Sequence, residues 1–425
     1  GLAKTSFNLQ TLSRPYQYSL FDSTPDKVYS SDIYMHHQQN ILYHNITNFA
    51  EDIDNKNRKV ISLFSGAGGF DIGLEQAGFE TVACVEIDPD CRETLRYNRK
   101  QWTLFEDNDG RIAGDIREIE PHELLALTRL EKGEVALVIG GAPCQPFSNI
   151  GKKQGTNDPK NGDLFLEFVK MVRGIHPQAF LFENVVGITQ ARHANVIQYM
   201  MDKLEGLGYG MSYTVLNAAN YGVGQRRQRF FLLGIQGVSK PAFPLPTHFK
   251  GAKEWATFVE QLDYQPTYKP DPWVTVEDVF HALPDDYQTR SDYAVMNISD
   301  IVLERMRRIG PGENFKVLPP EMLPNCWKSG KHQGNDTFGR LRLDEPSVTI
   351  RTAAYNPAKG KYIHPTENRG LNTIEMAALQ GFPLDWTFKT ATRKKMTLKS
   401  AGLQIGNAVP SLIAKALGLA IKAQI

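Results

Sequence analysis

Mainly apolar runs alternate with helix-like stretches between residues 58 and 236. The runs lie at 60–64, 81–87, 135–139, 179–182 and 229–235. Buried strands separated by helical segments are typical of a mostly parallel sheet with helices on both faces. The pattern therefore predicts an α/β, doubly wound domain over 58–236.

The rest of the chain has a different pattern. Residues 1–57 are polar without a clear period, and we assign them no role. Proline becomes frequent and the strand–helix alternation disappears over 237–395, which predicts a second, smaller and loop-rich domain. Residues 396–425 become helical again, with an apolar stretch over 411–423 that we expect to return to the first domain.

Composition limits the function classes. The 425 residues carry a formal net charge of +1, so any affinity for nucleic acid must come from a local basic face. Four cysteines form neither a disulfide framework nor a metal-ligand spacing, which predicts a reducing cytoplasm and no metal. The sequence lacks an apolar run of about eighteen residues, so we expect no membrane span.

A glycine-rich loop follows the first apolar run. Residues 65–69 read Ser-Gly-Ala-Gly-Gly and precede a helix-like stretch, which is where a nucleotide-like cofactor meets an α/β sheet. Glu86 ends the next predicted strand, at a distance that suits a ribose diol. Asp115 is expected at the end of a third strand, where it would suit an adenine amino group. These residues do not separate NAD from S-adenosylmethionine.

Cys144 lies between Pro143 and Pro146, directly after the run at 135–139. Two prolines cannot continue a strand or a helix, so the cysteine should lie on a stiff loop at the carboxyl end of the sheet. Ligands bind at that edge of open α/β sheets. The position favours a reactive cysteine over a structural one.

Several motifs together resemble the DNA (cytosine-5) methyltransferase family of bacterial type. They are the cofactor loop at 64–69, Gly-Ala-Pro-Cys-Gln-Pro-Phe-Ser at 141–148, Phe-Glu-Asn-Val at 182–185, Gln-Arg-Arg-Gln-Arg at 225–229, Leu-Gln-Gly-Phe-Pro at 379–383 and Gln-Ile-Gly-Asn-Ala-Val-Pro at 404–410. Their order agrees with the family's, and the resemblance covers about residues 59–418. It implies S-adenosylmethionine as cofactor, S-adenosylhomocysteine as product, and double-stranded DNA as partner.

The resemblance also implies catalytic roles. The thiolate of Cys144 would add to C6 of a flipped-out cytosine, so that C5 becomes able to attack the methyl group. Glu183 would contact N3 and the amino group, and Arg229 would bind O2. Arg227 would contact a phosphate or the loop that carries the cysteine.

Two further groups of residues are implied by the same resemblance. Those expected at the cofactor are Phe64, Gly66, Gly68, Gly69, Glu86, Ile87, Asp115, Ile116, Pro143, Leu164, Asn407 and Val409. Those expected at DNA are Gln145, Ser148, Arg227, Lys328, Lys331, Gln333, Asn335 and Arg340.

The sequence departs from the family at two places. Ser62 stands where many members carry Asp, which affects the cofactor loop. Residues 371–377 do not reproduce the usual Thr-x-Arg-Glu, which concerns packing between domains.

Three other functions stay open at this point. They are a transfer-RNA methyltransferase with the same motifs, an NAD-dependent oxidoreductase, and a DNA-binding regulator. A recognition segment of about one hundred residues favours duplex DNA. We expect a monomeric cytoplasmic enzyme.

Overall fold

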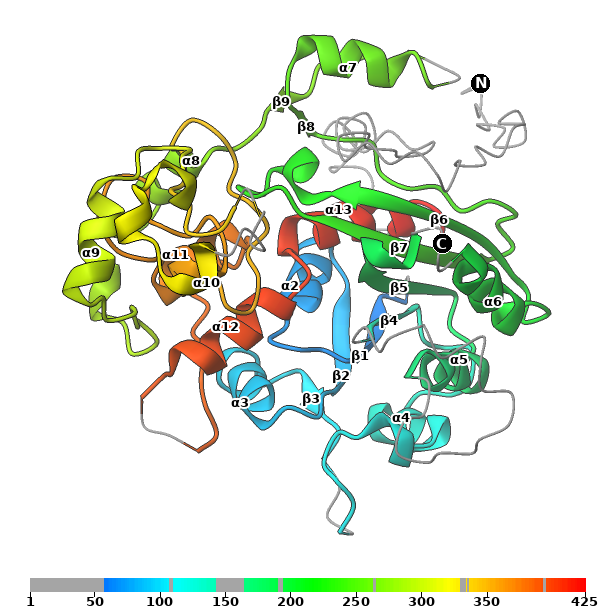
Figure 1. Cartoon of the computed structure of the whole chain (residues 1–425). Helices are drawn as coiled ribbons and strands as arrows, with labels where there is room; N and C mark the ends of the chain where they lie inside the picture. Colours follow the sequence, from blue (N-terminus) through cyan, green and yellow to red (C-terminus); the bar gives the residue numbers. More distant parts are fainter. Residues whose placement is uncertain are drawn as a thin grey trace.

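The computed structural model describes residues 57–106, 110–142, 164–189, 194–262, 265–328, 334, 336–392 and 395–425. A seven-stranded sheet forms its centre (Figure 1). In spatial order the strands are β3 (Thr103–Leu104), β2 (Glu80–Val85), β1 (Lys59–Leu63), β4 (Leu137–Gly141), β5 (Ala179–Val185), β7 (Gln228–Gln236) and β6 (Tyr209–Asn217). The first five run parallel, and β7 runs antiparallel to both of its neighbours.

This sheet confirms the predicted doubly wound, mostly parallel α/β fold. The edge strand β6 was not predicted, because its residues Tyr-Gly-Met-Ser-Tyr-Thr-Val-Leu-Asn are only partly buried and form no apolar run. Its pairing with β7 completes the sheet beside the strand that carries Arg229.

Helices cover both faces of the sheet. One face carries α4 (Pro121–Thr128), α5 (Leu164–Ile175) and α6 (Ala194–Leu204), and the other carries α2 (Gly69–Gln76) and α13 (Ser411–Lys422). Figure 1 shows α13 beside α2, although they come from opposite ends of the described chain. A Cβ on Gly73 would lie 2.1 Å from the carbonyl oxygen of Ser411, so glycine permits this close packing. The C-terminal helix α13 thus packs against the first helix of the sheet domain.

The C-terminal helices are apolar because they are largely buried inside the protein. Among the described residues, the continuous stretch Leu398–Lys422 has the length and hydropathy of a membrane span, but 78% of its most apolar window is buried inside the protein. Burial against α2 and the sheet accounts for this apolar character.

The segment 237–395 is built from short elements. Its longer ones are α7 (Ala252–Val259), α8 (Val276–His281), α9 (Asp300–Arg307), α10 (Asn325–Lys328) and α11 (Thr373–Leu379), with a small sheet of β8 (His248–Phe249) and β9 (Asp271–Pro272). The helices α3 (Pro89–Asn98) and α12 (Leu398–Asn407) contact each other across the two parts. Short 3-10 helices lie at 116–118, 186–189, 218–221, 287–289, 315–317, 320–322 and 357–359.

One cluster of buried side chains joins the two parts of the chain. It packs Ile72 and Leu95 of the sheet domain against Leu341, Ile350 and Trp386 of the second part. The two parts therefore share a core, and the domain boundaries at 237 and 395 stay predictions.

Candidate active site

The order of strands reverses between β1 and β4, since β2 and β3 lie on one side and β5 lies on the other. Ligands of open α/β sheets bind in the crevice beyond the carboxyl ends of the strands at such a point. The glycine loop follows β1, and the chain toward Cys144 follows β4. Both candidate motifs therefore start at the expected crevice.

The glycine loop has an unusual backbone. Phe64 adopts a φ of 55°, and Gly66 and Gly68 have φ values of 54° and 89°. Non-glycine residues in this region are uncommon and concentrate at functional sites. A Cβ on Gly69 would lie 2.4 Å from the carbonyl oxygen of Val409, so the loop packs directly on the C-terminal motif.

Glu86 is tied to this loop. Its Oε2 accepts a hydrogen bond from the Gly66 amide at 2.7 Å, and its Oε1 accepts one from the Asp88 amide at 2.7 Å. Burial raises the pKa of Glu86, while the two backbone hydrogen bonds oppose that rise. The next side chain, Ile87, is 47% exposed, which leaves an apolar surface beside the acid.

Asp115 reaches the same place by a different route from the one predicted. It does not end a third strand, because β3 stops at Leu104 and Asp115 caps the 3-10 helix at 116–118. A Cβ on Gly114 would lie 2.0 Å from the carbonyl oxygen of Glu86, so this glycine brings the two acids together. Arg117 donates to both oxygens of Asp115 and lowers its pKa.

Arg92 holds the two loops against each other. Its Nη1 donates to the carbonyl oxygens of Glu86 at 3.0 Å, Ile87 at 2.6 Å and Ala113 at 3.1 Å. Neither Arg92 nor Gly114 was predicted to shape this site. A glycine directly before Asp115 was the available signal for the close approach.

These residues suit the nucleoside part of S-adenosylmethionine. Two acids and an exposed isoleucine lie together beyond a glycine loop, and nothing lies within 4 Å of a Cβ built on Gly66. The carboxylate of Glu86 suits a ribose diol, and the apolar surface of Ile87 suits an adenine ring. The carboxylate of Asp115 suits the adenine amino group.

The other predicted cofactor residues lie in varied surroundings. Leu164 is half-buried at the start of α5, Ile116 is buried in the core, and Asn407 is exposed at the end of α12. Pro143 lies outside the described residues.

Glu183 and Arg229 form an ion pair at the carboxyl edge of the sheet. Arg229 Nε lies 3.0 Å from Glu183 Oε1, and the two side chains are 15% and 11% exposed. Burial raises the pKa of Glu183, and the charges of Arg229 and Arg227 oppose that rise. Arg229 therefore holds the acid in place, while burial makes its carboxyl group easier to protonate than one in water.

The strand that leads toward Cys144 passes directly beside this pair. Gly141 pairs with Glu183 in the sheet, and a Cβ on Gly141 would lie 2.7 Å from Glu183 Oε2. Asn184 Nδ2 donates to the carbonyl oxygen of Ala142 at 3.4 Å. Cys144 itself lies outside the described residues, as do Gln145 and Ser148.

Arg227 lies in the interior, which does not agree with the predicted phosphate contact. It is 1% exposed, and its Nη1 donates to the carbonyl oxygen of Ile350 at 2.9 Å. Its Nη2 donates to the carbonyl oxygens of Gly406 at 2.7 Å and Ala408 at 3.1 Å. Arg227 therefore connects the start of β7 to the C-terminal motif.

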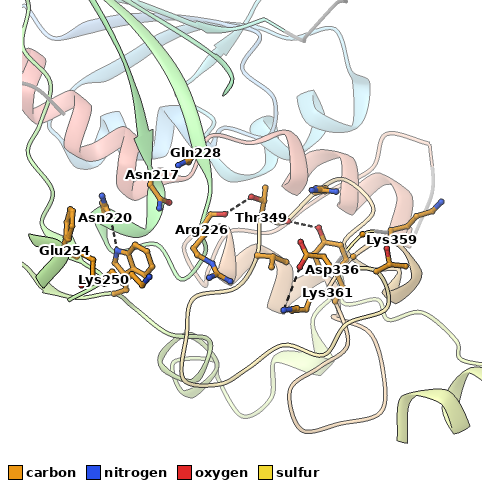
Figure 2. A pocket seen from close by; sticks show the side chains of 18 residues that line it. Asn217, Asn220, Arg226, Gln228, Lys250, Glu254, Asp336, Thr349, Lys359 and Lys361 are labelled. Atoms are coloured by element: carbon orange, nitrogen blue, oxygen red, sulfur yellow. Dashed lines mark hydrogen bonds and ion pairs between the residues drawn. The ribbon is translucent and has the colours of Figure 1, made fainter. Parts of the chain in front are cut away.

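A basic cavity of about 620 Å³ opens next to this edge of the sheet. Figure 2 shows Lys250 and Glu254 on one side of Arg226, and Lys359 and Lys361 on the other. The lining also includes Gln228, Trp273, Arg351 and Tyr362. The lining carries five basic and two acidic side chains, which leaves a local excess of positive charge on a protein whose net charge is only +1.

The predicted DNA contacts outside the catalytic motifs divide into three groups. Lys328 is exposed at the end of α10. Arg340 is 5% exposed, and its guanidinium donates to four backbone carbonyl oxygens and to Asn368 Oδ1. That geometry contradicts a DNA contact, because its donors already bind the protein. Lys331, Gln333 and Asn335 lie outside the described residues.

The segment 371–377, where the sequence differs from the family's usual motif, contains an acid that pairs with an arginine from just outside the segment. Arg369 donates to Glu375 Oε2 at 2.9 Å and to Oε1 at 2.7 Å. Asn372 caps α11 and accepts from the Glu375 amide. Arg369 therefore supplies a cation to this buried acid.

In the described part of the chain, no group of three or more His, Cys, Asp or Glu side chains is arranged to hold a metal.

Comparisons with known proteins agree with this geometry. Residues 58–423 match the model of the C-5 cytosine-specific DNA methylase family. The chain is 31% identical over 371 residues to the Type II methylase M.HgiDII of Herpetosiphon aurantiacus, covering 85% of this chain and 94% of that protein. It is 30% identical to the Type II methyltransferase M.Sau96I of Staphylococcus aureus, covering 86% and 75%.

Solved structures show the same fold. The chain superposes on Spodoptera frugiperda DNMT2 with a TM-score of 0.54 at 17% identity, covering 86% of this chain and 99% of that one. For the S. pombe Dnmt2 methyltransferase the TM-score is 0.53 at 15% identity, with coverage of 86% and 99%. With the family model matched over most of its length, this chain belongs to the C-5 cytosine-specific DNA methylase family.

Proposed function

We propose that this DNA cytosine methyltransferase binds its target base with Glu183 and Arg229 and attacks it with Cys144. The observation that carries the proposal is the 3.0 Å Glu183–Arg229 pair beside Gly141, three residues before the cysteine. A carboxyl group that is protonated and a guanidinium in contact present donors to the N3 and O2 edge of cytosine. A cysteine thiolate reaching that ring would meet C6.

The chemistry follows from these groups. The thiolate of Cys144 adds to C6, and a proton on Glu183 is shared with N3 as the ring gains electron density. C5 would then take the methyl group that S-adenosylmethionine supplies, with S-adenosylhomocysteine as the leaving group. Transfer of the C5 proton to water and expulsion of the Cys144 thiolate would restore the ring. Guanidinium charge near the loop favours the thiolate over the thiol.

The cofactor would lie across the glycine loop. In this proposal Glu86 accepts from the ribose hydroxyls, Ile87 packs on the adenine ring, and Asp115 accepts from the adenine amino group. Asp115 already accepts from Arg117, and a carboxylate has room for further donors. The side chains expected here need no metal.

Duplex DNA would lie over the basic cavity at Arg226, Lys250 and Lys361. The target nucleotide must rotate out of the helix, since C6 is not accessible inside the base stack; this rotation costs a few kcal/mol. Phosphate contacts from the cavity's lysines and arginines would fix the position of the duplex without reading its sequence. We propose a monomer that acts in the cytoplasm.

Methyl transfer to duplex DNA tests this function. We expect labelled methyl from S-adenosylmethionine in duplex DNA and not in transfer RNA. Cys144→Ser should keep DNA and cofactor binding while losing turnover. Methylation of transfer RNA alone would favour the transfer-RNA alternative, and near-normal turnover of Cys144→Ser would exclude the covalent mechanism.

A further inference from the structure

Asp71 is a buried carboxylate that none of the assigned roles uses. It lies on α2 with 0% exposure, and its oxygens accept from two hydroxyl groups. Ser62 Oγ donates to Oδ2 at 2.9 Å, and Thr81 Oγ1 donates to Oδ1 at 2.9 Å. A buried carboxylate is costly unless its bonding partners are well placed. Its position therefore calls for an explanation.

A chain of hydrogen bonds runs from Asp71 to the cofactor loop. Ser65 Oγ donates to Ser62 Oγ at 2.9 Å, and Ser62 Oγ in turn donates to Asp71. The residue after Ser65 is Gly66, whose amide donates to Glu86 at 2.7 Å. Two hydroxyl groups thus connect Asp71 to the turn that presents Gly66 to Glu86.

The residue type at position 62 explains why this series of hydrogen bonds matters. Many relatives are expected to carry Asp where this chain has Ser62. Here the hydroxyl is at 62 and the carboxylate faces it from 71, at 2.9 Å. In this protein the carboxylate beneath the loop comes from the helix α2, and the hydroxyl group comes from the strand β1.

We propose that Asp71 is a positioning residue, which holds the Ser65–Gly66 turn in the conformation that binds the methyl donor by acting through Ser62. The inference rests on the proposed function, because it assumes that this loop binds S-adenosylmethionine. Because Asp71 is buried and contacts neither the methyl donor nor the target base in this proposal, its substitution should change the affinity for S-adenosylmethionine more than the rate of methyl transfer.

A matched pair of variants separates positioning from simple core packing. Ser62→Ala and Thr81→Val each remove one hydroxyl donor from the same carboxylate, but only Ser62 connects it to the loop. By calorimetry with S-adenosylhomocysteine, Ser62→Ala should weaken binding about tenfold, the effect expected for one hydrogen bond to a charged group. Thr81→Val should bind within about twofold of wild type, while its melting temperature falls as much as that of Ser62→Ala.

An exchange of the two side chains supplies the second test. Asp71→Ser removes the carboxylate, and Ser62→Asp places two carboxylates in contact, so each should weaken S-adenosylhomocysteine binding. The double variant S62D/D71S restores one carboxylate facing one hydroxyl, and its affinity should recover to within about threefold of wild type.

The outcomes are distinct. If the folded Ser62→Ala binds like wild type, or Thr81→Val loses as much affinity as Ser62→Ala, the positioning role is overturned. An exchange variant that folds without recovering affinity also overturns it. Failure of the wild-type protein itself to bind S-adenosylhomocysteine would contradict the proposed function, and the inference with it.

Discussion

Gly141→Ala is the sharpest test of the position of Glu183. A Cβ at residue 141 would lie 2.7 Å from Glu183 Oε2, whereas ordinary van der Waals contact begins at 3.4 Å. The separation must therefore grow by about 0.7 Å, the difference between these two distances. The carboxylate is the end of a flexible side chain, so it should move in preference to the paired strands.

That movement should reduce activity much more than stability. Displacement of the carboxylate disturbs its 3.0 Å contact with Arg229 and its approach to the base. Since a misplacement of about 1 Å can cost about a hundredfold in rate, we expect Gly141→Ala to lower the single-turnover rate constant of methyl transfer on the order of tenfold to a hundredfold. This corresponds to about 1.4 to 2.7 kcal/mol in the activation free energy.

Single-turnover methyl transfer at saturating donor measures the effect. Gly187→Ala is the matched control, because the nearest atom to its added Cβ would be Val185 Cγ2 at 3.9 Å. The control should retain activity within about twofold, and both variants should bind S-adenosylhomocysteine normally. A Gly141→Ala enzyme with the wild-type single-turnover rate would contradict this prediction, since methyl transfer would then not depend on the position of Glu183.

Three further predictions concern other parts of the protein. Burial raises the pKa of Asp71 to about 7. The hydrogen bonds from Ser62 and Thr81 oppose this rise in pKa, and the negative charge of Glu75 adds to it. Relative to Asp71→Asn, the wild-type free energy of unfolding should fall as pH rises from about 4, near the unfolded pKa, through about 7; parallel denaturation curves would contradict this. Lys361→Gln should weaken binding to all DNA sequences alike and reduce the slope of log affinity against log salt by about one, whereas an unchanged slope would remove Lys361 from the DNA surface. Arg340→Gln should instead lower the melting temperature at an unchanged salt slope, and the reverse pattern would restore Arg340 as a DNA contact.

The apolar runs predicted the centre of the fold because buried parallel strands have a strong local signal. The glycine loop and Glu86 could be placed from the sequence, since both follow directly from the end of a strand. The edge strand β6 lacked such a signal because its side chains are only partly buried. Asp115 was assigned to a strand end, but a short β3 and a long connection bring it to Glu86 through Gly114.

Buried arginines were the harder problem. Arg340 and Arg227 bind backbone carbonyl groups that are distant in the sequence, such as Ile350, 123 residues from Arg227. A sequence contains no local sign of such partners. Arg340 was therefore predicted to contact DNA, and Arg227 to contact a phosphate or the loop that carries Cys144. The residue type was informative, because the five hydrogen-bond donors of a planar guanidinium group can connect several loops at once. The direction in which each arginine side chain points could not be predicted from the sequence.

The motif Gln-Arg-Arg-Gln-Arg shows how direction decides function. Side chains of extended chain alternate between two faces, so residues 225, 227 and 229 face one way and residues 226 and 228 the other. Arg226 and Gln228 line the basic cavity, while Gln225 and Arg227 are buried and Arg229 binds Glu183. One short segment therefore has two roles: its outward side chains belong to the proposed DNA surface, and its inward ones hold the C-terminal motif and Glu183. The alternation was readable from the sequence, but only the position of β7 between β5 and β6 determines which of its faces borders the cavity and which is buried.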